Sequence, residues 1–60
     1  MTPNQFIELR NKMQLNQAEL ALLMGVTSRS IQRLEAGPVD RRSELAIKYL
    51  YYEFTRSTKT

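Results

Sequence analysis

Residues 17–37 of the chain read QAELALLMGVTSRSIQRLEAG. Two helix-forming segments flank Gly25-Val26-Thr27, and a connection this short forces two helices to cross steeply instead of running antiparallel. The crossing needs a small residue where the backbones approach, a left-handed residue at the end of the first helix, and buried apolar residues on the second. The residues that meet these needs, in order, are Ala21, Gly25, Val26, Ile31 and Leu34. We therefore expect a helix-turn-helix over about residues 17–36.

Capping signals predict where the first two helices begin. Thr2-Pro3-Asn4-Gln5 combines a hydroxyl cap, a proline in the first helical position and a glutamine that can return a hydrogen bond. The helix that follows carries Phe6, Leu9 and Met13 at helical spacing. Asn16 and Glu19 repeat the capping pattern before a second helix of about two turns. The apolar stripe expected on that second helix is Leu20, Ala21, Leu23 and Met24.

Two further helices complete the predicted fold. Thr27 can cap the third helix, which Gly37-Pro38 must end, and either Asp40 or Ser43 can cap a fourth that runs to about Arg56. No segment alternates apolar and polar residues as a strand would. The sequence therefore predicts an all-α fold, a compact bundle of four helices. We expect a single domain over residues 1–56 and a frayed tail over 57–60.

Composition narrows the range of functions. The 60 residues include no Cys and no His, so disulfides, a metal site, a cofactor and most forms of nucleophilic catalysis are not expected. The acidic residues are scattered over different caps and faces, and no glycine-rich loop can cradle a phosphate, so we do not expect an enzyme. The longest apolar run, Leu20–Val26, is far shorter than the ~20 residues of a membrane span. The expected protein is soluble and cytoplasmic, and its net charge of +3 weakly favours an anionic partner.

The helix-turn-helix residues resemble a known family, the lambda-repressor-like or Cro-type helix-turn-helix DNA-binding proteins. The resemblance is carried by Gln17–Ala21, Met24–Thr27 and Ile31–Gly37, and with the flanking helices it covers roughly residues 3–55. It implies a protein that binds double-stranded DNA and is encoded by a prokaryote or a phage. It also implies the DNA-binding half of a repressor without an attached sensor domain, so no small-molecule ligand is expected.

The family places the second helix of the pair in the major groove and the preceding helix across the backbone. Carried onto this chain, this implies that the base-reading residues are Ser28, Arg29, Gln32 and Arg33. The alternative for these four is an ordinary solvated helix face, but Ile31 and Leu34 already define a buried side that points away from them.

Phosphate contacts are implied at two helix starts. At the first, Asn16 and Gln17 stand where backbone N–H groups and the positive end of the helix dipole suit an anion. Helix capping is part of the reason for an asparagine at position 16. At the second, Arg41 and Arg42 follow the Gly37-Pro38 turn. Cations are mildly unfavourable at a helix N-terminus, so a phosphate ligand explains this pair better than a solvated turn does. The family also uses an ion pair between its first and third helices, and this implies a structural pair between Arg10 and Glu35.

The fourth helix has two apolar faces. Leu45, Tyr49 and Tyr52 fall on one side, and Ala46, Leu50 and Phe54, with Ile47 and Tyr51 beside them, fall on the other. One face must close the core, and the other is expected to bind a partner, most simply a second copy of the chain. The candidate interface residues from the two faces are Tyr49, Tyr52, Leu50 and Phe54. Alternatives for the exposed face are tyrosines with solvated hydroxyls and an amphipathic membrane contact, which the few flanking cations disfavour.

Two functions remain open at this point. The first is a sequence-specific transcriptional regulator, most simply a repressor that binds a two-fold symmetric operator as a homodimer. The second is a protein-interaction module, such as an antitoxin or accessory subunit, that keeps the helix-turn-helix fold and uses the fourth helix to bind its partner. Affinity for random duplex that falls with salt would separate the two, because a pure adaptor has none.

Overall fold

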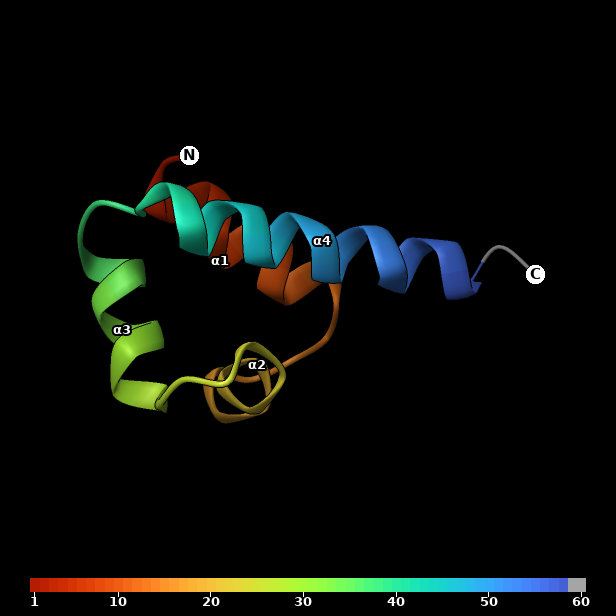
Figure 1. The fold of residues 1–60 in the computed structure, drawn as a ribbon, viewed down its shortest axis with the longest axis horizontal. Coiled ribbons are helices and arrows are strands. Elements are labelled where there is room, and N and C mark those ends of the chain that lie inside the picture. Colours follow the sequence, from red (N-terminus) through yellow and green to blue (C-terminus); the bar gives the residue numbers. More distant parts are fainter. Residues whose placement is uncertain (59–60) are drawn as a thin grey trace.

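A computed structural model describes residues 1–58 and shows four helices joined by short connections (Figure 1). The helices are α1 (Pro3–Lys12), α2 (Gln17–Met24), α3 (Ser28–Ala36) and α4 (Arg41–Thr58). The predicted all-α, four-helix fold is confirmed. The fourth helix runs two residues beyond its expected end at Arg56, and residues 59–60 of the expected tail lie outside the described part of the chain.

The predicted caps are present. Thr2 Oγ1 accepts from the Gln5 backbone N–H at 3.2 Å while Gln5 Oε1 accepts from the Thr2 N–H at 2.9 Å. The same reciprocal pair joins Asn16 and Glu19, at 2.7 and 2.9 Å. Thr27 Oγ1 accepts from the Ser30 N–H at 3.2 Å and begins α3. Each cap satisfies backbone donors that the helix itself cannot, so each helix start is encoded locally.

The end of α1 was not predicted. Gln14 adopts φ 58°, the left-handed conformation that glycine usually supplies at a helix end. The Gln14 N–H donates to the Asn11 carbonyl oxygen at 2.9 Å, and the Leu15 N–H donates to the Arg10 carbonyl oxygen at 3.3 Å. This pair of bonds closes the helix as a Schellman motif. Leu15 then packs against the core, so burial stabilises a conformation that Gln14 alone disfavours.

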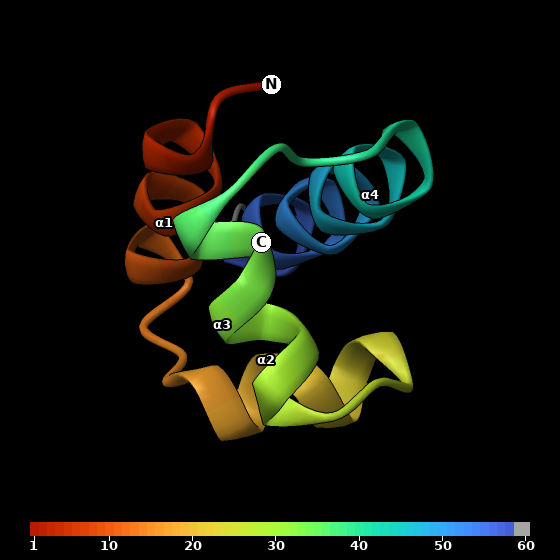
Figure 2. The same ribbon diagram turned by 90° about the vertical axis from the view of Figure 1, so that its left-hand side faces the viewer.

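The core lies where α3 meets the other helices. Helix α3 packs against α1 and α2, and α1 also packs against α4. Figure 2 shows α2 crossing α3 steeply, and Figure 1 shows α4 along the long axis with its last turns extending past the other helices. The buried core residues are Phe6, Met13, Leu20, Ala21, Ile31 and Ile47.

Two residues expected in the core are exposed instead. Leu23 is 58% exposed, and Val26 is 41% exposed. Leu20, Ala21 and Met24 form the side of α2 that faces the core. Leu23 points to a neighbouring side of α2, which no other helix of the described chain covers. Val26 follows the left-handed Gly25, which turns the chain out of α2 before α3 begins. The apolar stripe predicted for α2 is therefore narrower than expected.

The turn of the helix-turn-helix gives the first prediction. Ala21 is 3% exposed, so Ala21→Leu should lower the free energy of unfolding by ~1–3 kcal/mol through overpacking. Gly25 has φ 72°, and nothing lies within 4 Å of a Cβ built on it, so Gly25→Val should cost ~1–2 kcal/mol through conformation alone. Thermal melting measures both losses. Ala18→Leu, exposed on the same helix, and Gly25→Asn, which tolerates positive φ, should change stability less. Parent-like melting of both Ala21→Leu and Gly25→Val would contradict the packing described here.

A second prediction concerns acid stability. Glu44 accepts from the Lys48 ammonium at 2.8 Å and from the Met1 ammonium at 3.0 Å, and these bonds lower the pKa of Glu44 from 4.5 to about 2. A depressed carboxyl pKa stabilises the folded state above the ordinary value, and this stabilisation disappears as the pH falls from about 4.5 towards 2. Glu44→Gln should therefore melt below wild type at neutral pH and approach it near pH 2. Glu8→Gln, an exposed charge-matched control, should show no such convergence.

Candidate nucleic-acid interface

The outer face of α3 carries the four residues predicted to read bases. Ser28, Arg29, Gln32 and Arg33 are all exposed, while Ile31 on the opposite side is fully buried. Within residues 1–58, the Arg29, Gln32 and Arg33 side chains make no hydrogen bond or ion pair. The fold therefore leaves their donors available to an external ligand.

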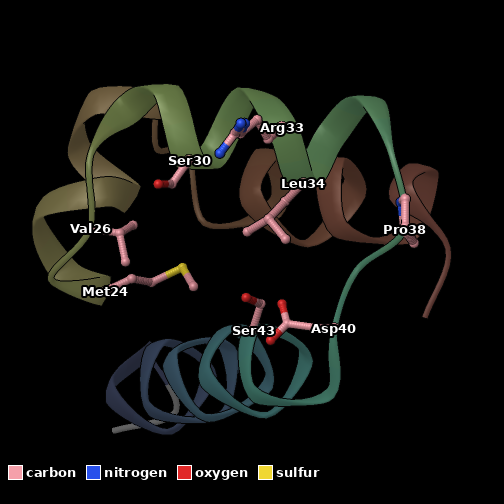
Figure 3. A pocket seen from close by; sticks show the side chains of 8 residues that line it. All are labelled: Met24, Val26, Ser30, Arg33, Leu34, Pro38, Asp40 and Ser43. Atoms are coloured by element: carbon pink, nitrogen blue, oxygen red, sulfur yellow. The ribbon is translucent and has the colours of Figure 1, made fainter.

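Arg33 also stands at the rim of a hollow of about 450 Å³ between α3, the end of α2 and the start of α4. Figure 3 shows Met24 and Leu34 pointing into this hollow, with Asp40 just before α4 and Ser43 in its first turn facing it. Its lining residues are Met24, Val26, Ser30, Arg33, Leu34, Pro38, Asp40 and Ser43. Because the hollow separates α3 from α4 here, the long Arg33 side chain has room to change direction.

The start of α2 places the two predicted phosphate ligands differently. The Asn16 side chain accepts from the Glu19 N–H, so its oxygen is occupied by the cap. The Gln17 side chain is not simply directed at solvent: Gln17 Nε2 donates to Glu35 Oε1 at 2.8 Å. Nothing in the sequence indicated this contact, since the two residues are 18 positions apart and lie on different helices.

The predicted Arg10–Glu35 ion pair is present and joins α1 to α3. Arg10 Nε donates to Glu35 Oε2 at 2.6 Å, and Arg10 Nη1 donates to the Leu15 carbonyl oxygen at 2.9 Å. The two side chains are only 15% and 9% exposed, so a charge left without its partner here would be costly. With Gln17, the pair forms a cluster that ties α1, the start of α2 and the end of α3 together.

Arg41 and Arg42 occupy the exposed first turn of α4. Asp40 precedes them at the cap position, and the Ser43 hydroxyl that donates to its carboxylate lowers the pKa of Asp40. Of the two caps considered from the sequence, Asp40 is the one that stands at the N-cap position, because α4 begins at Arg41. Two cations in a first turn oppose the positive end of the helix dipole, although the carboxylates of Asp40 and Glu44 also lie at this helix start.

The two faces of α4 separate as predicted, and this limits the candidate partner surface. Leu50 and Phe54 are partly buried and pack against the core, so they help to close the monomer and form the less exposed of the two faces. Leu45, Tyr49 and Tyr52 form the outer face and are 56%, 62% and 58% exposed. We call these three residues the α4 outer face. No helix in the described residues 1–58 is long and apolar enough to cross a membrane.

A family comparison fits this arrangement. A helix-turn-helix family model matches residues 6–50, which include most of α1, all of α2 and α3, and the first half of α4. The chain belongs to the Cro/C1-type helix-turn-helix family. It is accordingly a DNA-binding regulator with double-stranded DNA as its ligand. No curated protein and no solved structure matches the chain.

Proposed function

We propose that this helix-turn-helix protein is a small cytoplasmic repressor that recognises a specific DNA sequence. The observation that carries the proposal is the outward placement of Arg29, Gln32 and Arg33 opposite buried Ile31, with no partner for their donors in the described chain. An α-helix fits the major groove of B-DNA, where arginine pairs with guanine O6 and N7 and glutamine pairs with adenine N6 and N7. Helix α3 supplies both residue types on one face.

Phosphate contacts would set the register of α3 in the groove. Gln17 stands at the N-terminus of α2, and Arg41 and Arg42 stand at the N-terminus of α4. These positions lie before and after the reading helix in the chain, and we expect both to contact the DNA backbone beside the groove. Contacts of this kind orient the protein without reading sequence, and base contacts from α3 then supply the discrimination.

A homodimer would double the recognition surface. Leu45, Tyr49 and Tyr52 are spaced by four and then three residues, the repeat by which two helices pack along a shared apolar seam. Three large side chains left more than half exposed make this surface unfavourable in water. A two-fold axis through the α4 outer face would generate a symmetric pair of reading helices, and a repressor of this kind acts by occupying its operator.

The direct test is selection of bound duplexes from a random library. The expected result is one enriched motif with two-fold symmetry, rich in positions where guanine or adenine can meet Arg29, Gln32 and Arg33. An enriched motif without symmetry would contradict the dimer but not the base reading. A pool that stays random after repeated selection would contradict sequence-specific regulation.

A protein-interaction module is the second candidate, and one observation favours it. Leu22 is 82% exposed and its neighbour Leu23 is 58% exposed, so α2 presents apolar surface separate from the α4 outer face. The discriminating measurement is affinity for random duplex at several salt concentrations. A DNA regulator binds random duplex with an affinity that falls steeply as salt rises, whereas a pure adaptor shows no such affinity.

A further inference from the structure

One side-chain hydrogen bond joins the start of α2 to the last turn of α3, and the start of α2 is where a phosphate contact is proposed. Gln17 is the first residue of α2, Glu35 lies in the last turn of α3, and Gln17 Nε2 donates to Glu35 Oε1 at 2.8 Å. The acceptor is itself held in place, because Arg10 Nε donates to the other carboxylate oxygen at 2.6 Å. The Glu35 side chain is only 9% exposed. The orientation of the Gln17 amide is therefore set by a nearly buried, doubly held carboxylate.

A primary amide nitrogen has two N–H donors, and Glu35 uses one of them. The second makes no hydrogen bond within residues 1–58. We propose that Glu35 is a positioning residue for DNA binding: it holds the Gln17 carboxamide so that the second N–H is presented to a DNA phosphate. This inference rests on the proposed function, because it assumes that the start of α2 meets the DNA backbone.

The hydrogen bond to Glu35 fixes the Gln17 side chain before DNA binds, and this preorganisation should strengthen DNA affinity. A free glutamine side chain must lose rotamer freedom when it grips a phosphate, and that loss weakens binding. Here the Glu35 bond has already restricted the side chain. Arg10 neutralises the Glu35 carboxylate, so this anion does not repel the phosphate that approaches Gln17. The contribution of Gln17 to affinity should consequently exist only while Glu35 is present.

A double-mutant cycle tests this dependence. Gln17→Met, which keeps the length but donates no hydrogen bond, is made in wild type and in an R10M/E35M background. That background replaces the whole ion pair with apolar side chains, a change that buried pairs often tolerate. Binding to a selected duplex is measured per folded molecule, with folding checked by circular dichroism. We expect Gln17→Met to weaken binding about tenfold in wild type and by no more than about twofold in the background.

Arg42→Ala is the matched control. Arg42 lies on α4 and makes no bond to the Arg10–Glu35–Gln17 cluster, so its loss should be the same factor in both backgrounds. An equal Gln17→Met loss in both backgrounds would overturn the positioning role and leave the proposed function intact. A wild type that binds no duplex at all would overturn both, so the two failures are distinguishable.

A second measurement does not depend on the folding of the R10M/E35M background. In nuclear magnetic resonance spectra of the free wild type, one Gln17 side-chain amide proton should exchange with solvent more slowly than those of exposed Gln32. The selected duplex should then protect the second Gln17 proton as well. Gln17 protons that exchange like those of Gln32 in the free protein would overturn the proposal.

Discussion

Tyr49→Glu and Phe54→Glu are expected to have opposite consequences, although both place a carboxylate on α4. Phe54 is partly buried against the core, so replacing its ring with a carboxylate should cost ~3 kcal/mol or more through lost packing and desolvation of the new charge. A domain of this length has a total stability on the order of 3–9 kcal/mol, so Phe54→Glu should be largely unfolded. Tyr49 is 62% exposed, so Tyr49→Glu should remain folded but lose self-association and bind DNA more weakly.

Thermal melting and sedimentation velocity separate these outcomes. Leu45→Glu, on the same outer face, should reproduce the folded monomer expected of Tyr49→Glu. Asn11→Glu, which adds the same charge to exposed α1, should keep the parent's melting and sedimentation. A wild type that sediments as a monomer both free and on DNA would refute the dimer, and a Phe54→Glu that melts like the parent would refute the assignment of the α4 faces.

Much of the fold could be predicted because its determinants are local. Thr2, Asn16 and Thr27 cap helices through residues three positions away, and Gly25 supplies the positive φ that the turn requires. The end of α1 could not be predicted in this way. Gln14 adopts its left-handed conformation in a segment that burial of Leu15 anchors, and that burial depends on helices elsewhere in the chain.

The candidate DNA-binding site could be predicted only in part from the sequence. The outward face of α3 follows from the positions of Ile31 and Leu34, but the Arg10–Glu35 pair was expected only through a family resemblance. The bond from Gln17 to Glu35 could not be predicted from either source. It needs the crossing angle of α2 and α3 and the rotamer of a long side chain, and no local pattern encodes these. For the same reason the exposure of Leu23 and Val26 emerged only from the packed structure.

Replacing the α3 arginines should affect specific and random DNA differently, and this is the largest effect expected on binding. If Arg29 and Arg33 reach base edges, Arg29→Ala and Arg33→Ala should each cost ~1–3 kcal/mol on the preferred duplex. Each should also relax the preference at one base pair per half-site, while affinity for scrambled duplex changes far less. Arg42→Ala should instead weaken binding to both duplexes alike and reduce the log–log salt slope by about one unit per monomer.

A titration of each variant on preferred and scrambled duplex at several salt concentrations distinguishes base contacts from phosphate contacts. Arg29 lies in the first turn of α3 and can also turn to a phosphate, whereas Arg33 lies one turn further along beside the hollow that gives it room. A loss confined to the preferred duplex assigns an arginine to a base edge. A loss shared by both duplexes with a shallower salt slope assigns it to a phosphate, because counterion release is independent of sequence. Equal losses on both duplexes for Arg29, Gln32 and Arg33 alike would mean that α3 only grips the backbone, and the sequence-specific repressor proposed here would have to be abandoned.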